Sequence, residues 1–142
     1  MNSYGLIDLH CDTLAEYWKY AHTGNPDTLD DPGRVLSLSN MPKDVHWAQF
    51  YAVFIPDEER GQAAIDYFEK NRANFYRQME KFGDRVAPCR NADDMEKAWA
   101  AGKAAAFLTI ENGSALAGDL SRVHTLAEQG VRAITLTWNG EN

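Results

Sequence analysis

Residues 5–12 include several side chains of types that bind metal ions. Residues 5–9 form a mostly apolar run of strand length, which ends in His10, Cys11 and Asp12. Because side chains alternate between the two faces of a strand, we expect Asp8, His10 and Asp12 to share one face. Ionisable groups on a buried strand are costly unless they are paired, and imidazole and carboxylate ligands both suit zinc. The segment predicts a metal site, with an internally hydrogen-bonded His–Asp pair as the alternative.

Glu111 is a second candidate ligand, because it directly follows the apolar residues 103–110. A charged side chain at the end of such a run is costly to bury without a partner. The alternatives to a metal ligand are a capping role or a salt bridge. The choice depends on whether the elements that carry Glu111, His10 and Asp12 bring the three side chains together.

Hydrophobic periodicity divides the chain into alternating strand and helix patterns. Strands are predicted at residues 5–9, 47–55, 103–110 and 131–137. Helices are predicted at residues 13–21, 60–82, 91–101 and 114–129, with a long loop at residues 22–43 and no clear pattern at residues 85–90. No hairpin signal separates the strands, so we expect a parallel α/β sheet with right-handed crossovers. The carboxyl ends of parallel strands meet at one edge, which predicts that His10, Asp12 and Glu111 converge.

The composition excludes several classes of function. Fourteen basic and 21 acidic residues give a net charge of -7, which argues against a nucleic-acid or anionic-membrane surface. No apolar run approaches the roughly 20 residues of a membrane span. We also expect no signal peptide, since the chain enters a strand pattern at once. The two cysteines, Cys11 and Cys89, are too far apart for a Cys-x-x-Cys site, so we expect a reducing, cytoplasmic setting.

Four motifs, taken together, resemble the membrane (renal-type) dipeptidases, which form peptidase family M19 and include many bacterial members. The motifs are IDLHCDT at residues 7–13, QF at 49–50, IENG at 110–113 and GVRAITLT at 130–137. They occur in the order and spacing of that family, and the resemblance runs through essentially the whole chain. The specificity comes from the combination, since each motif alone is short.

The resemblance implies a (β/α)8 barrel of the TIM type that binds two zinc ions at its carboxyl face and hydrolyses dipeptides. By this resemblance His10 and Asp12 are ligands of the first zinc, and Glu111 is the carboxylate that bridges both ions. Glu111 thereby takes a catalytic role, because a bridged pair of cations about 3.5–4 Å apart activates water and polarises a carbonyl. Trp138 stands where vertebrate-type members place a histidine that contacts the substrate carbonyl, and Asn139 is a neighbouring candidate for that contact.

The length of 142 residues is short for such a barrel, which takes about 250 residues or more. We therefore expect residues 1–142 to be the N-terminal half, about four β/α units, of a longer polypeptide that is a homodimer when intact. The remaining half of the barrel would supply the rest of the second zinc site, so the fragment alone is expected to be inactive. Two alternatives stay open. One is another barrel metallohydrolase of amidohydrolase type, disfavoured because those use a His-x-His strand end, and the other is a non-catalytic half-barrel that self-associates.

Overall fold

The computed structural model describes residues 4–14 and 28–140, and in that part it contains one sheet with three α-helices. The strands are β1 (Tyr4–Cys11), β2 (Val45–Phe54), β3 (Val86–Pro88), β4 (Ala104–Glu111) and β5 (Val131–Thr135). The α-helices are α2 (Gln62–Lys81), α3 (Ala92–Ala100) and α4 (Arg122–Glu128). Two short 3-10 turns complete the described elements, η1 (Thr28–Asp30) and η2 (Gly113–Leu116). The predicted helix at residues 13–21 falls almost entirely outside the described residues.

Every strand pair in the sheet is parallel, as predicted from the helical crossovers. The order is β1-β2-β4-β3, and β5 also pairs with β4. One edge of β4 is occupied by β2, so β3 and β5 share the other edge: β3 pairs with its first three residues and β5 with its last four. The strand β3 lies within residues 85–90, where the sequence showed no clear pattern. A strand of three residues is too short for periodicity to reveal.

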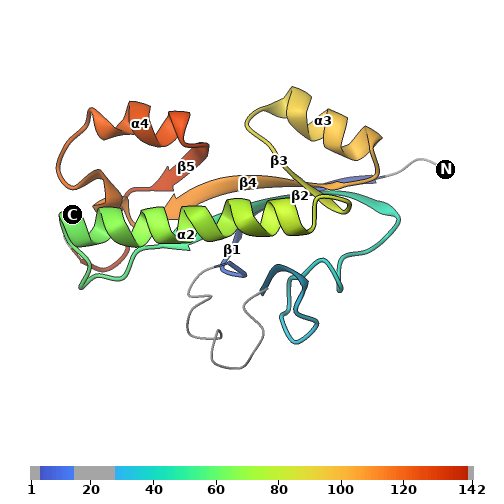
Figure 1. Cartoon of the computed structure of the whole chain (residues 1–142), viewed down its shortest axis with the longest axis horizontal. Helices are drawn as coiled ribbons and strands as arrows, with labels where there is room; N and C mark the ends of the chain where they lie inside the picture. Colours follow the sequence, from blue (N-terminus) through green and yellow to red (C-terminus); the bar gives the residue numbers. More distant parts are fainter. Residues whose placement is uncertain (1–3, 15–27, 141–142) are drawn as a thin grey trace.

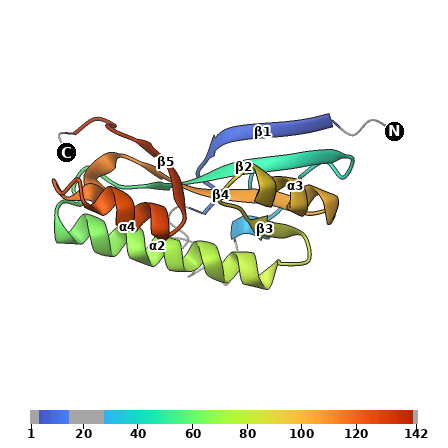
Figure 2. The same ribbon diagram turned by 90° about the horizontal axis from the view of Figure 1, so that it is seen from above.

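Helix α2 lies along one face of the sheet and forms the main core with it (Figures 1 and 2). The helix predicted at residues 60–82 is confirmed over Gln62–Lys81, and its residues Phe68, Phe75 and Met79 are buried. They belong to one cluster with buried residues of the two central strands, which are Tyr51, Val53, Leu108 and Ile110. No helix in the described part of the chain is long and apolar enough to cross a membrane.

The opposite side of the sheet, which we call the site face, carries Phe50, Phe54, Phe107 and Glu111. Pairing aligns Phe50 with Phe107 and Phe54 with Glu111, and the rings of Phe50 and Phe107 stack with centroids 4.7 Å apart. Helix α3 covers the amino end of this face, where the indole Nε1 of Trp99 donates a hydrogen bond to a β2 carbonyl. The carboxyl end of the site face is left to Glu111 and its neighbours.

The prediction of a buried first strand is wrong for the described structure. Strand β1 pairs with β2 alone and lies at the edge of the sheet (Figure 2). Its apolar side chains are consequently exposed, with Leu6 43%, Ile7 51% and Leu9 68% accessible. An apolar strand with a free edge calls for a covering element.

The predicted helix at residues 114–129 is also wrong in its first half. The chain forms the short turn η2 instead, and Ala117 and Gly118 then adopt left-handed conformations with φ of 52° and 74°. Helix α4 begins only at Arg122. Leu126, within α4, is buried, whereas Leu120 is 79% exposed because it falls in the break before this helix.

The described part of the predicted long loop is fastened to the helical side of the sheet. Leu29 is fully buried, and its backbone N–H donates to the Gln78 side chain at 2.8 Å. Farther along, the Thr13 hydroxyl donates to the Leu36 carbonyl at 2.6 Å. The loop therefore closes back on the residue that directly follows Asp12.

A bidentate salt bridge joins this loop to the start of β3. It predicts that the stability of the fold depends on pH. The Arg85 guanidinium donates to both carboxylate oxygens of Asp30, at 2.9 and 2.8 Å, and thereby lowers the pKa of Asp30. A carboxyl whose pKa is lower folded than unfolded stabilises the fold above about pH 4, and the contribution is lost as the pH falls through the folded-state value. Asp30→Asn should lower the free energy of unfolding by about 0.5–1 kcal/mol at pH 7. Urea denaturation at pH 7 and at pH 3 measures it, with the exposed Asp44→Asn as the control; an equal loss at both pH values would contradict the pairing.

Candidate metal centre

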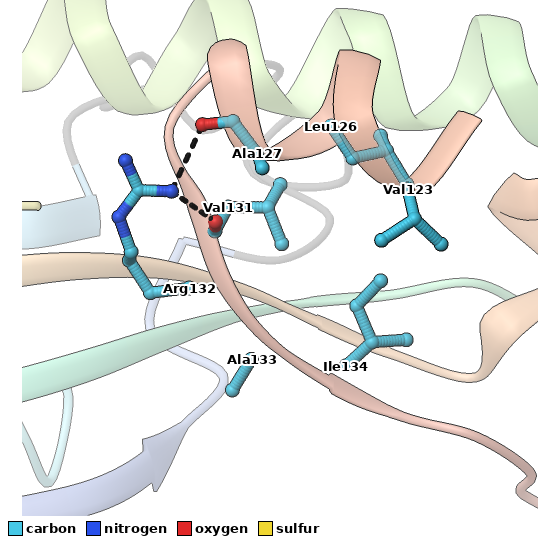
Figure 3. A pocket seen from close by; sticks show the side chains of 7 residues that line it. All are labelled: Val123, Leu126, Ala127, Val131, Arg132, Ala133 and Ile134. Carbon is cyan, nitrogen blue, oxygen red and sulfur yellow. Dashed lines mark hydrogen bonds between the residues drawn. The ribbon is translucent and has the colours of Figure 1, made fainter. Parts of the chain in front are cut away.

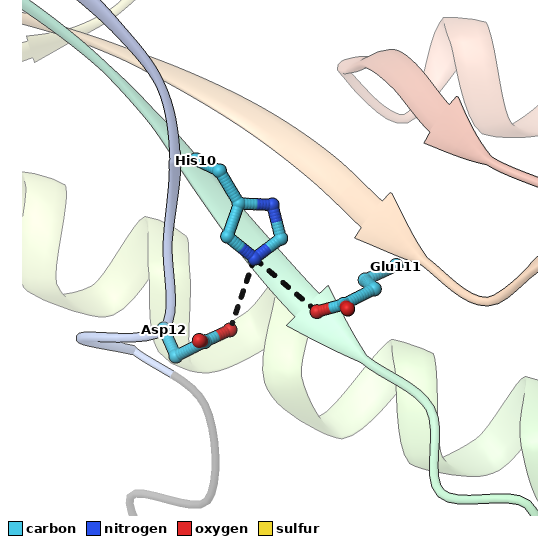
Figure 4. A group of neighbouring side chains, drawn as sticks. All are labelled: His10, Asp12 and Glu111. Carbon is cyan, nitrogen blue, oxygen red and sulfur yellow. Dashed lines mark ion pairs between the residues drawn. The ribbon is translucent and has the colours of Figure 1, made fainter. Parts of the chain in front are cut away.

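His10, Asp12 and Glu111 converge at the carboxyl end of the sheet (Figure 4). His10 lies near the end of β1, Asp12 directly follows that strand, and Glu111 is the last residue of β4. The Nε2 atom of His10 is 3.5 Å from Asp12 Oδ1 and 3.2 Å from Glu111 Oε2. One ligand atom from each of the three residues lies within 4.8 Å of the other two. The convergence predicted from parallel topology is thus present in the structure.

A bulge in β1 turns His10 toward the site face, which corrects the expected alternation. Asp8 is aligned with Gln49 and Cys11 with Tyr51, so two residues of β1 oppose one residue of β2. Both of these partners lie on the side that packs against α2. Asp8 therefore does not share a face with His10, and its carboxylate instead accepts the backbone N–H of His10 at 3.2 Å. Bulges beside functional sites commonly re-aim a side chain in this way.

Cys11 is adjacent to His10 in sequence but does not belong to the group. Its side chain is buried in the hydrophobic cluster on the α2 side of the sheet. Burial there raises the pKa of the Cys11 thiol to about 11, so that the sulfur is protonated at neutral pH. Because the sulfur lies on the opposite side of the sheet from His10, the donor set of the group is one imidazole and two carboxylates.

The spacing of His10 from each of the two carboxylates is compatible with a divalent cation. Two ligand atoms that are each about 2.0–2.2 Å from a tetrahedral zinc ion are about 3.3–3.6 Å apart. The distances of 3.5 and 3.2 Å from His10 Nε2 to the two carboxylates lie close to that value. Among the described residues, His10 is the sole basic group paired with Asp12 or Glu111. Two carboxylates that face a single imidazole favour a bound cation between them.

Solvent can reach the group from the open end of the sheet. The side chains of His10 and Asp12 are 45% and 62% exposed, whereas that of Glu111 is 18% exposed. Glu111 is also the best fixed of the three, because its carbonyl accepts the Ile55 N–H at 2.9 Å and it pairs with strands on both sides. The arrangement can hold a metal ion while leaving coordination positions open to water or substrate.

The two residues predicted to contact substrate lie after β5, at the same end of the sheet. The Trp138 ring packs edge-on against Phe54, with centroids 4.9 Å apart. Phe54 is aligned with Glu111, which places Trp138 on the site face beside the candidate ligands. Asn139 is exposed one residue farther along. The contact of either residue with a substrate stays a prediction.

Asn112 lies in the IENG motif at residues 110–113 and was not itself predicted to support the site. It is fully buried and has a φ of 77°, a conformation that few residues other than glycine adopt. Its side chain donates to the Ile55 carbonyl at 2.8 Å and accepts from the Ser114 N–H at 3.3 Å. The sequence signal for this conformation was the residue type. Asparagine tolerates a positive φ better than most non-glycine residues, and here it directly follows the end of a strand.

A separate cavity of about 200 Å³ lies between α4 and β5 (Figure 3). It is lined mostly by apolar side chains, among them Val123, Leu126 and Ile134. The Arg132 guanidinium lies at its border and donates to the Ala127 carbonyl at 2.9 Å. None of the three candidate metal ligands borders this cavity.

A parallel α/β sheet with possible metal ligands at the carboxyl ends of its strands is typical of barrel metalloenzymes. The family can be stated more closely, because the model of the membrane dipeptidase family, peptidase family M19, matches residues 1–142. The chain belongs to this family, which confirms the resemblance drawn from the four motifs. Among curated proteins, none matches the sequence.

Solved structures share the fold and are longer. Dipeptidase AC, a metallopeptidase of family M19, is 19% identical to this chain and superposes with a TM-score of 0.79. The match covers 98% of this chain and 44% of the dipeptidase AC chain. A Rhodobacter sphaeroides metallopeptidase, liganded with a phosphinate mimic of the dipeptide L-Ala-D-Ala, is 17% identical with a TM-score of 0.80. The match covers 99% of this chain and 47% of that metallopeptidase. The probable dipeptidase PvdM of Pseudomonas aeruginosa is 20% identical with a TM-score of 0.76, and the match covers 96% of this chain and 35% of PvdM. The chain thus spans less than half of each structure and corresponds to part of a barrel.

Proposed function

We propose that this chain is part of a zinc-dependent dipeptidase whose site contains two metal ions. The observation that carries the proposal is the convergence of His10, Asp12 and Glu111 within 4.8 Å at the carboxyl end of the sheet. Membership of the membrane dipeptidase family supports dipeptides as the substrate class. The Rhodobacter sphaeroides relative was solved with a dipeptide mimic, which agrees with that class.

Each of the three residues has a role in this proposal. His10 and Asp12 would hold the first zinc ion, and Glu111 would bridge the first and second ions. When bound, such ions supply Lewis-acid polarisation of the scissile carbonyl and lower the pKa of water. The chain itself holds Glu111 between neighbouring strands. Trp138 and Asn139 would contact the dipeptide.

We further propose that residues 1–142 are the N-terminal half of a longer polypeptide. Two features support this proposal, namely the 44% and 47% coverage of two family structures and the exposed apolar side chains of β1. The remaining half would lie against the outer edge of β1 and the apolar cavity beside β5, and would complete the second zinc site. On this account the isolated chain does not hydrolyse dipeptides, and a homodimer of the intact protein stays a prediction.

Metal analysis of the full-length protein tests the proposed site. Purified protein should contain near-stoichiometric zinc, and Asp12→Ala should reduce the zinc content several-fold, because one of three protein ligands of the first ion is lost. The matched control is Asp44→Ala, which removes an exposed carboxylate that has no ion pair among the described residues. Unchanged zinc content and unchanged thermal stability in Asp12→Ala would instead favour a structural half-barrel that associates with itself.

A further inference from the structure

Four polar side chains form a closed ring directly behind Glu111, at the carboxyl ends of β2 and β4. The Arg60 guanidinium donates to the Ser114 hydroxyl, which donates to Asn112 Oδ1 at 2.9 Å. Asn112 Nδ2 donates to Asp57 Oδ1 at 3.3 Å, and this oxygen lies 3.7 Å from Arg60 Nη2. We call these four residues the Asn112 ring.

The ring lies where the ends of three strands are joined, and its side chains contribute the link between β2 and β4. Asn112 Nδ2 also donates to the carbonyl of Ile55, which follows β2, at 2.8 Å. The backbone N–H groups of Asn112 and Gly113 donate to the carbonyls of Thr135 and Leu136, at 3.1 and 3.0 Å, which joins the end of β4 to the end of β5. These bonds involve the residue that directly follows Glu111. The backbone at the carboxyl end of β4, where Glu111 lies, is therefore held from both neighbouring strands.

The segment that carries the predicted substrate contacts rests on the same ring. A Cβ atom at Gly140 would clash with the Arg60 guanidinium and would lie 3.0 Å from the Asp57 carboxyl carbon. The backbone at Gly140 thus packs directly on the Arg60–Asp57 pair, two residues after Trp138. The absence of a side chain at Gly140 permits this close approach of backbone to side chains.

We propose that the Asn112 ring is a positioning device that holds Glu111, and with it the segment of Trp138, in the geometry the metal site requires. The inference rests on the proposed function, since it assumes that Glu111 bridges two ions. Ligand side chains must be held to about 0.5 Å by their supporting residues, and a strand end without such support frays. The ring acts on Glu111 through the backbone of the next residue, Asn112. Loss of a group that is hydrogen-bonded to a metal ligand typically costs 10–100-fold in metal affinity, and we expect a loss of that order when this backbone is freed.

The test is Asn112→Gly in the full-length protein, because glycine removes the side chain and still accepts the φ of 77°. The matched control is Asn71→Ala, which removes another buried asparagine, on α2, whose amide donates to the Tyr67 carbonyl. Two quantities are measured: hydrogen exchange of the metal-free protein in peptides that span residues 108–117, and the zinc dissociation constant from chelator competition.

In Asn112→Gly we expect the backbone amides at positions 112 and 113 to exchange at least about tenfold faster than in the wild type, and the zinc dissociation constant to rise about 10–100-fold. Asn71→Ala should leave both quantities within about twofold even where its melting temperature falls. If Asn112→Gly does not fold, Ser114→Ala opens the same ring by one hydroxyl and should change both quantities in the same direction.

The outcomes separate this inference from the proposed function. Unchanged exchange in the ring variants, or unchanged zinc affinity with faster exchange, would overturn the positioning role while the metal site stands. A wild-type protein that binds no zinc would overturn the proposed function and the metal part of this inference, whereas faster exchange in Asn112→Gly would still support the ordering of Glu111 by the ring.

Discussion

Glu111→Gln in the full-length protein is expected to lower kcat/KM for dipeptides by about 10³-fold or more. Glutamine keeps the size of the side chain but removes the negative charge that two cations would share. A bridging carboxylate contributes to charge stabilisation worth several kcal/mol, and each 1.36 kcal/mol corresponds to about a factor of ten in rate. Steady-state hydrolysis of a simple dipeptide, with zinc content measured on the same sample, gives the comparison.

The control for this substitution is Glu128→Gln, which neutralises an exposed glutamate at the end of α4. This control should keep wild-type kinetics, because α4 carries none of the candidate ligands. A Glu111→Gln protein with full zinc content and kcat/KM within tenfold of wild type would show that Glu111 is not the bridging ligand.

The largest loss of stability is expected from Phe75→Ala. Phe75 is 1% exposed in the core between α2 and the sheet, where its ring contacts Tyr51 and Tyr76 at centroid distances of 6.3 and 5.1 Å. Truncation of a buried phenylalanine removes its burial and leaves a cavity, and costs about 3–5 kcal/mol. Chemical denaturation of the metal-free protein measures this loss.

Val35→Ala is the control for Phe75→Ala, since Val35 is 99% exposed and its truncation should change the free energy of unfolding by less than about 0.5 kcal/mol. Phe75 lies on the side of the sheet opposite Glu111, so folded Phe75→Ala should bind zinc as wild type does. A loss below about 1 kcal/mol, or a large loss of zinc affinity in the folded variant, would contradict the separation of the sheet into a stabilising face and a site face.

Elements with strong local signals were predictable from the sequence. Helix α2 carries a long apolar stripe, and α3 begins after Asn91, whose side chain accepts the Asp94 N–H at 2.8 Å as expected of an N-cap. The strands β2 and β4 have the apolar, β-branched and aromatic character of buried parallel strands. Their parallel pairing followed from the helices that connect them.

Other features depend on contacts that the sequence does not reveal. The bulge in β1 exists because Asp8 and Cys11 are both aligned with residues on the α2 side of β2, and strict alternation cannot foresee it. The break before α4 arises from Ala117, which has a high helical propensity but is held in a left-handed turn that closes on the Ser114 carbonyl. In both cases tertiary packing overrides the local preference.

The candidate site was predictable to the extent that topology determines it. The carboxyl ends of parallel strands lie at one edge of the sheet, so His10 and Asp12 at the end of β1 and Glu111 at the end of β4 share that edge and converge across the intervening β2. The supporting residues were not predictable, because Asp57, Arg60 and Ser114 are polar residues of ordinary loops whose mutual contacts appear only in three dimensions. The assignment of zinc to the group rests on chemistry and on family membership.

Anomalous diffraction at the zinc absorption edge, from crystals of the full-length protein, tests the central claim most directly. We predict an anomalous peak at about 2.0–2.2 Å from His10 Nε2, Asp12 and Glu111, with a second peak on the other oxygen of Glu111. Zinc found elsewhere, or Glu111 turned away from the ion held by His10 and Asp12, would contradict it.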